Sequence, residues 1–104
     1  MPFLLGYAKC PNLVHKTCGS EFEITPRARF SETPELRDCE NSCNEDDECK
    51  FFYKFTAAHI NMCLRYRSCD TIRHATQIGS TYSKEHNCPI DEKKPDQSRK
   101  KIIN

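Results

Sequence analysis

Cysteine carries the clearest chemistry in this chain, because a thiol in a protein typically forms a disulfide or binds a metal. Eight cysteines occur in 104 residues. Zinc sites usually show paired C-x-x-C or H-x-x-x-H ligands, whereas the shortest gaps between cysteines here hold three residues, after Cys39, and five, after Cys43. An even count at this density favours a disulfide framework made in an oxidising compartment. We therefore predict a secreted or cell-surface protein with no metal and no other cofactor.

Catalytic motifs are the second chemistry to consider. The sequence has no nucleophile elbow, no H-E-x-x-H pair and no glycine-rich phosphate loop, and it contains only three glycines. If every cysteine is paired, no free thiol remains as a nucleophile. The chain is therefore predicted not to be an enzyme.

Basic and aromatic residues in the second half of the chain are the main candidates for a ligand surface. On adjacent strands such residues can converge on a patch that suits sulfated glycans or an acidic protein surface. The set is Lys50, Lys54, Arg65, Tyr66, Arg67, Arg73 and His74. Two other roles stay open: a solvated sheet face, which is commoner, or pairing of the arginines with acids of a neighbouring helix at Glu40, Glu45 or Asp47.

A lectin site is a second hypothesis, because lectins stack an aromatic ring on a sugar and hold its hydroxyls with polar groups. The available groups are Tyr53, Tyr66, Tyr82, His59, His74 and Lys54. For each tyrosine taken alone, packing in the core is the commoner role. Both roles remain open for these tyrosines.

The charge pattern limits the classes of partner. The net charge is +1, which argues against binding to nucleic acid, and no segment is long and apolar enough for direct insertion into a membrane. The acidic run at 45–48 lacks the alternating oxygen ligands and glycine turn of a calcium loop. Residues 89–104 are charged and lack periodicity, so we expect residues 1–88 to form one domain followed by a flexible tail or linker containing Arg99, Lys100 and Lys101.

One helix is predicted from Thr33 as N-cap and Pro34 as first helical residue, ending near Asn44. Leu36, Cys39 and Cys43 then share a face. The helix would present two cysteines, one turn apart, to whatever lies beneath it.

Strands should follow the helix and also precede it. The aromatic segment 49–55 predicts a central strand with Cys49, Phe51, Tyr53 and Phe55 on one face, and 62–67 an antiparallel partner. If Cys63 points to the helix, Arg65 and Arg67 do so too. They would then lie on a different side of the sheet from Lys50 and Lys54. Shorter extended pieces are expected at 21–24, at 27–30 and at 77–82.

The order of these cysteines resembles the PAN/apple family. A helix with Cys39-x-x-x-Cys43, then Cys49-Lys50-Phe51-Phe52-Tyr53 and Asn61-Met62-Cys63-Leu64 on two strands, matches that family's core over residues 18–88. The resemblance implies a small disulfide-rich α+β domain with one helix packed on a short antiparallel sheet. It further implies the pairs Cys39–Cys63 and Cys43–Cys49 and a bridge between the termini, Cys18–Cys88, which leaves Cys10 with Cys69.

The resemblance also implies an extracellular binding or adhesion module. Its partner is expected to be a protein, or a glycan of the sulfated or galactose type, with other domains of a longer chain as further expected partners. The alternative is a secreted effector that inhibits a host protease or haemostatic protein. In that case Arg67, next to Ser68-Cys69, would lie in an exposed reactive-site loop.

Overall fold

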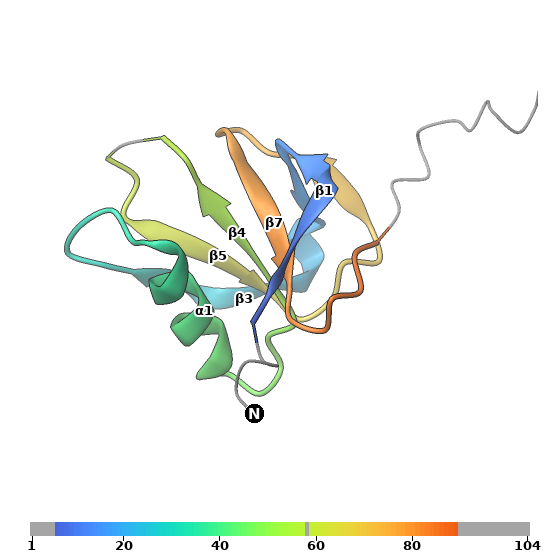
Figure 1. Ribbon diagram of the computed structural model, residues 1–104, viewed down its shortest axis with the longest axis horizontal. Helices are drawn as coiled ribbons and strands as arrows, with labels where there is room; N and C mark the ends of the chain where they lie inside the picture. The colour runs from blue at the N-terminus through green and yellow to red at the C-terminus, as the bar shows by residue number, and fades with distance from the viewer. Residues whose placement is uncertain (1–5, 58, 90–104) are drawn as a thin grey trace, which may run out of the picture.

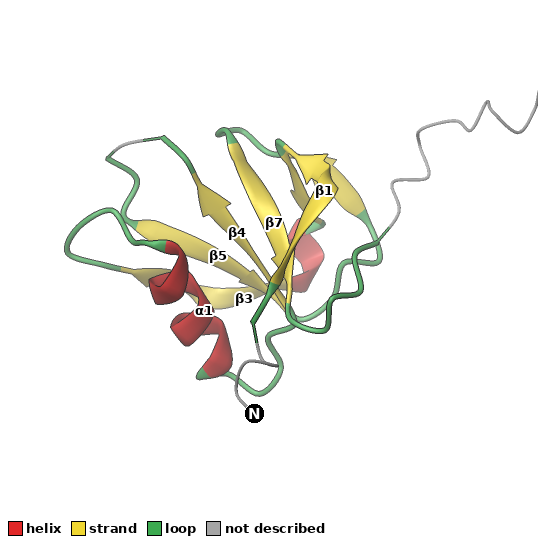
Figure 2. Cartoon of the chain, in the orientation of Figure 1, coloured by secondary structure: helices red, strands yellow, loops and turns green. Residues whose placement is uncertain are grey.

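Strands are the main regular elements of the molecule, and one α-helix packs on the larger of two sheets (Figure 2). The computed structural model describes residues 6–57 and 59–89, so the predicted tail beyond residue 89, with its three terminal bases, lies outside the described residues. Five strands form an antiparallel sheet in the order β1-β7-β4-β5-β3, and β2 pairs with β6 (Figure 1). The strands are β1 (Ala8–Val14), β2 (Lys16–Cys18), β3 (Glu23–Arg29), β4 (Phe51–Phe55), β5 (Met62–Tyr66), β6 (Ile72–His74) and β7 (Gly79–Ser83).

The centre of the large sheet is the pair of strands that the sequence predicts. β4 and β5 run antiparallel, with Phe51 opposite Tyr66 and Tyr53 opposite Leu64. β7 pairs with the other side of β4, so β4 has neighbours on both sides. The aromatic segment therefore forms a central strand, where large rings gain most from burial.

The helix α1 (Leu36–Asn44) begins two residues later than predicted. Its N-cap is Glu35 rather than Thr33, and the Glu35 backbone N–H donates to Asp38 Oδ2 at 2.8 Å. Asp38 closes a capping box, which satisfies backbone donors that the start of a helix leaves free. Pro34 is buried just ahead of the helix instead of opening it. The described residues hold no helix with the length and apolar character needed to cross a bilayer.

The two faces of the large sheet carry separate cores. On the face covered by α1, called the helix face below, Phe52 packs with Cys39, Cys43, Cys49 and Cys63. The opposite face, called the ribbon face, packs against the two-stranded ribbon of β2 and β6. Its buried residues are Cys10, Leu13, Cys18, Tyr53, Phe55, Leu64, Tyr66 and Cys69. The molecule thus has three layers: helix, sheet and ribbon.

The predicted sharing of a face by Cys49 and Phe51 is wrong. β4 begins only at Phe51, so strand alternation does not extend back to Cys49, which packs on the helix face beside Phe52. Lys54 lies opposite Cys63 in the β4–β5 register. Because directly opposed residues share a face, Lys54 and Arg65 lie on the same side as the helix, not on different sides as expected.

The segment before Cys18 belongs to the fold, although the family resemblance excludes it. β1 pairs with β7, placing Ala8 opposite Ser83 and Val14 opposite Ser80, and forms one edge of the sheet. The chain then turns at His15, which has a φ of 63°, and enters the ribbon. Neither β1 nor β2 is predicted from the sequence.

The segment from residue 20 to residue 30 differs in detail from its prediction. Ser20–Phe22 form a short 3-10 turn (η2) instead of a strand, and β3 runs from Glu23 through Pro26 to Arg29 without stopping. Pro26 is tolerated because β3 is an edge strand and its register shifts between Ile24 and Ala28.

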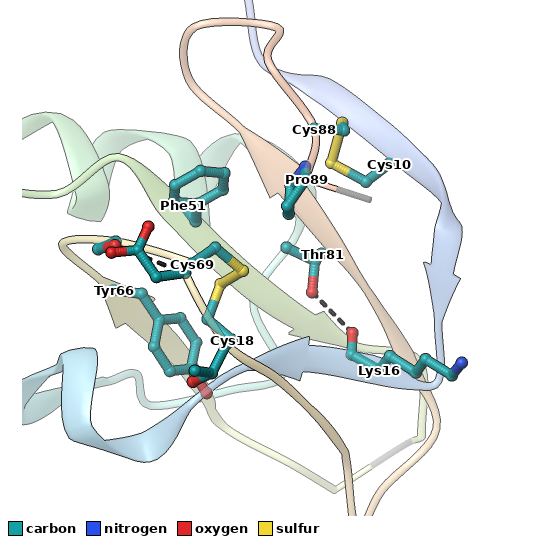
Figure 3. The surroundings of a disulfide bond; sticks show 12 residues. Cys10, Lys16, Cys18, Phe51, Tyr66, Cys69, Thr81, Cys88 and Pro89 are labelled. Atoms are coloured by element: carbon teal, nitrogen blue, oxygen red, sulfur yellow. Dashed lines mark hydrogen bonds between the residues drawn. A yellow bond between two sulfur atoms is a disulfide. The ribbon is translucent and has the colours of Figure 1, made fainter. Parts of the chain in front are cut away.

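Four disulfides close the structure, and two of them confirm the predicted pairs. Cys39 is bonded to Cys63 and Cys43 to Cys49, so both helix cysteines are tied to the chain beneath them. The predicted pairs Cys18–Cys88 and Cys10–Cys69 are wrong, because the bonds are Cys10–Cys88 and Cys18–Cys69. Figure 3 shows the latter bond beside Tyr66 and Phe51.

Strand pairing explains the exchange of partners. β1 lies beside β7, and Cys88 follows β7 by a short connection, so Cys10 is its neighbour. Cys18 lies opposite Ile72 in the ribbon, and Ile72 follows Cys69 by three residues, so Cys18 and Cys69 are close together. The bridge between the termini exists, but Cys10 makes it. Four disulfides are compatible with an extracellular or secreted protein.

Candidate functional site

The structure divides the seven predicted ligand residues among separate surfaces. Lys54 and Arg65 lie on the helix face, and Tyr66 and Arg73 lie on the ribbon face. The other three are Lys50, Arg67 and His74, of which the first two border a hollow at one end of the sheet and the last is exposed on β6. A single continuous basic patch is therefore not formed.

Arg65 acts as a link between layers. Its Nη2 donates to the Pro26 carbonyl oxygen at 2.8 Å, and its Nη1 to the Ser42 carbonyl oxygen in the last turn of α1 at 3.5 Å. A cation near a helix C-terminus interacts favourably with the carbonyls there. Arg65 thus reaches the helix, as predicted, but it binds backbone oxygens.

A hollow of about 340 Å³ lies beside Arg65, between β3 and α1. Its charged lining mixes both signs: the cations are Arg27, Arg29 and Arg65, and the acids are Asp38 and Glu45. The opposed charges reduce the net field that a charged ligand would meet.

Arg67 is held to the neighbouring chain on both its backbone and its side chain. Its N–H donates to the Phe22 carbonyl oxygen at 3.0 Å, and Nη2 donates to the Glu21 carbonyl oxygen at 3.2 Å. Its guanidinium carbon lies 6.0 Å from the centre of the Phe22 ring. A reactive-site loop must enter a protease cleft in extended form, with its basic side chain free, and Arg67 has neither property here.

The tyrosines proposed for sugar stacking offer little ring surface. Tyr53 and Tyr66 are fully buried, and Tyr82 is half-buried on the helix face, where it stacks on Phe52 at 5.1 Å between ring centres. Their predicted polar partners His59 and His74 are exposed, on different loops and strands. Core packing is thus the observed role of Tyr53 and Tyr66.

A hollow of about 450 Å³ lies on the ribbon face. We call it the ribbon pocket. Its apolar lining comes from β4, β5 and the loops beside them: Tyr53, Phe55, Ile60, Met62, Leu64 and Ala75. Its polar lining is Ser20, Glu23, Arg27, Arg73, Thr76 and Gln77. Ligand sites in proteins typically have this mixture of apolar walls and a few polar groups.

Hydrogen bonds fix the base of the ribbon pocket. The Tyr53 hydroxyl donates to the Gln77 carbonyl oxygen at 2.7 Å, and Arg73 Nη2 donates to the Tyr66 phenol oxygen at 3.0 Å. Burial raises the pKa of Tyr53 to about 12 and also raises the pKa of Tyr66, although the nearby Arg73 opposes the shift. Both phenols are therefore neutral at physiological pH.

The disulfide Cys18–Cys69 joins the end of β2 to the connection between β5 and β6, near this pocket. Hydrogen bonds hold the ribbon against the sheet: His15 N–H donates to the Gly79 carbonyl oxygen at 2.9 Å, and the Thr81 hydroxyl donates to the Lys16 carbonyl oxygen at 2.8 Å. A Cβ on Gly19 would lie 2.1 Å from Thr71 Oγ1, so a side chain there would displace the Thr71 hydroxyl. The wall of the pocket is thereby fixed to its floor.

Sequence reasoning finds only part of this pocket. Arg73 is among the predicted ligand residues and Tyr53 among the predicted lectin residues, but Glu23, Arg27 and Met62 are missed. The sequence did carry one signal for this pocket: the alternation of residues in β5 places Leu64 and Tyr66 on the side of the sheet away from the helix. The strand β6 is too short to give a pattern of its own.

No family model, no curated protein and no solved structure matches this chain. Among residues 6–57 and 59–89, no group of three or more histidine, cysteine, aspartate or glutamate side chains is arranged to hold a metal ion.

Proposed function

We propose that this chain is a secreted or cell-surface recognition module of the PAN/apple type, and that it binds an extracellular protein through the ribbon pocket. The compartment is inferred from the four disulfides. The family is inferred from the helix cysteines, whose bridges to Cys63 and Cys49 agree with what the resemblance implies. Cys18–Cys69 is the departure from that pattern.

One observation carries the choice of site: a pocket of about 450 Å³ with a mostly apolar base remains open between the sheet and the ribbon, which hydrogen bonds hold together. Exposed apolar surface is costly, and its retention in a rigid concave site favours a binding role. Ile60, Met62 and Ala75, each half-buried, supply this apolar surface, and the buried Phe55 and Leu64 lie beneath it.

A protein partner is favoured over a glycan because of the residues that line the pocket. Sugar sites depend on a free aromatic ring face and several hydrogen-bonding groups, whereas the apolar lining here includes Ile60, Met62 and Ala75, which suit an apolar side chain. A sulfated or galactose-type glycan remains the alternative ligand. The bonded Arg67 gives no support to the inhibitor alternative.

The experiment compares one substitution in two hollows. Ala75→Leu reduces the volume of the ribbon pocket, and Ala28→Leu makes the same change in the hollow between β3 and α1. The domain and both variants are applied to an array of extracellular proteins and to a glycan array at increasing salt, after circular dichroism confirms folding.

We expect a protein partner whose binding is lost in Ala75→Leu and retained in Ala28→Leu. Glycan binding that survives high salt, without a protein partner, would replace the proposal with the lectin alternative. Binding lost only in Ala28→Leu would move the site to the helix side.

A further inference from the structure

The charges around the ribbon pocket are unequally compensated. Glu23 is neutralised by Arg27, because Arg27 Nε lies 2.6 Å from Glu23 Oε2 and Nη2 lies 3.3 Å from Oε1. The Glu23 side chain is only 8% exposed, although Arg27 is 42% exposed, and the two-bond pair is formed within the protein itself. Glu23 therefore has little charge left to offer Arg73.

Arg73 is the cation of the pocket without such a partner. In the described part of the chain its guanidinium donates to Tyr66, a neutral phenol, and its buried Nε has no hydrogen-bond partner. The nearby carboxylate of Glu21 is fully exposed and accepts a hydrogen bond from the Thr71 hydroxyl at 2.9 Å. A guanidinium has five N–H donors, so most of the capacity of Arg73 remains unused.

The rest of the lining is apolar next to this cation. Ile60, Met62 and Ala75 are half-buried at the pocket, and Phe55 and Leu64 lie deeper. A ligand that suits both parts has one negative charge and an apolar group a short distance from it.

We propose that the ribbon pocket binds an acidic side chain of a partner protein, held by Arg73, together with an adjacent apolar side chain held by Met62 and Leu64. This rests on the proposed function, since it specifies the ligand of the same pocket. A carboxylate matches the single uncompensated charge of Arg73, whereas a phosphate or sulfate ester would be better matched by a cluster of cations. Acidic side chains are also far commoner on protein surfaces than chain termini.

Capped dipeptides test the charge directly. Leucine-glutamate and leucine-glutamine, each acetylated and amidated, are titrated into the 15N-labelled domain to about 10 mM, a range suited to weak binding. We expect the glutamate peptide to shift the amide signals of Phe55, Leu64 and Arg73 and to bind about tenfold more tightly than the glutamine peptide, because a charge-assisted hydrogen bond is lost in the latter.

Variants then assign the effect to Arg73. Arg73→Gln should bind both peptides with equal affinity, and Arg73→Lys should keep a reduced preference for glutamate, because lysine lacks the planar fork. The control is Arg37→Gln, which removes one exposed arginine on the helix and should leave the preference unchanged. The comparison of the two peptides on the unaltered domain stands even if an Arg73 variant fails to fold.

The outcomes separate this inference from the function on which it rests. Equal binding of both peptides at the pocket would overturn the acidic ligand and leave the pocket as a protein site. Binding of glucuronate in place of the peptides, or of a free C-terminal carboxylate alone, would also overturn it. Loss of partner binding on the array in Ala75→Leu tests the proposed function separately.

Discussion

The helix face and the ribbon face of the same sheet are closed in opposite ways. The helix face uses disulfides of short span, Cys43–Cys49 across 6 residues and Cys39–Cys63 across 24, and fills its interior with sulfur and aromatic groups. The ribbon face uses Cys18–Cys69 across 51 residues and Cys10–Cys88 across 78, and it retains the larger hollow. Local bridges thus secure the packed helix face, and distant bridges lie on the face that contains the ribbon pocket.

The largest expected effect comes from removing a long bridge. Replacing Cys10 and Cys88 by serine should lower the free energy of unfolding by about 4.5 kcal/mol, against about 2 kcal/mol for the same change at Cys43 and Cys49, because a longer closed loop removes more entropy from the unfolded chain. Guanidinium unfolding curves measure both. Equal losses would show that loop length does not distinguish the two faces.

Core substitutions sharpen the same comparison. Phe52 is fully buried, with ring centres 5.0 Å from Tyr7 and 5.1 Å from Tyr82, so Phe52→Ala should lower the free energy of unfolding by about 4 kcal/mol.

Phe55 borders an existing hollow, so its removal deprives fewer neighbours of contacts. Phe55→Ala should cost about 2 kcal/mol in the same unfolding measurement. A larger loss at Phe55 than at Phe52 would contradict the view that Phe52 is the more completely surrounded of the two rings.

Arg65 tests the link between the helix and the sheet. Arg65→Met keeps much of the side-chain bulk but removes the bonds to the Pro26 and Ser42 carbonyl oxygens, and should cost about 1.5 kcal/mol. Arg67→Met, at an exposed position outside the helix interface, should cost about 0.5 kcal/mol. Thermal unfolding of the two variants compares them, and equal effects would remove the special role of Arg65.

Alkaline titration addresses both faces through one tyrosine on each. Burial raises the pKa of Tyr7, on the helix face, and of Tyr53, on the ribbon face, from 10.0 to about 12. Folding thus favours the neutral phenols, so their contribution to stability is complete below pH 10 and is lost as the pH rises toward 12. Tyrosinate absorbance, recorded rapidly after each pH jump while the protein is still folded, should show two tyrosines that ionise only well above pH 10. Tyr7→Phe and Tyr53→Phe should each remove one of these two tyrosines from the titration. Ionisation complete near pH 10 in the folded protein would refute the burial argument.

How far the sequence predicts the fold depends on how many residues separate the contacting elements along the chain. The helix, β4, β5 and their two bridges lie within residues 36–66, where local patterns predict the elements and the family resemblance implies both pairings. β1, β2 and β6 gave no clear signal, since β2 and β6 have three residues each and β1 contains Pro11. The pairing of Cys10 and Cys18 depends on those strands, and for this reason it was predicted wrongly.

Sequence reasoning also found only part of the candidate site. Arg73 and Tyr53 were found from residue type, since cations and aromatic rings are common in ligand sites. Glu23, Arg27 and Met62 were missed because they line the pocket only through the pairing of β3 with β5 and the register shift in β3. The separation of Lys54 and Arg65 from Arg73 depends on where β4 begins, which the aromatic run alone does not define.

By itself the sequence determined that disulfides hold the chain and that an aromatic strand lies at its centre, because these follow from residue chemistry. The two bridges of the helix were implied by the family resemblance. Only the tertiary structure decided which of Cys10 and Cys18 joins Cys88, which face each charged side chain occupies, and that a hollow remains under the ribbon. Those features depend on β1 pairing with β7 and β2 with β6. Contacts between segments more than 50 residues apart are set by the packing of the whole domain, and no local pattern records them.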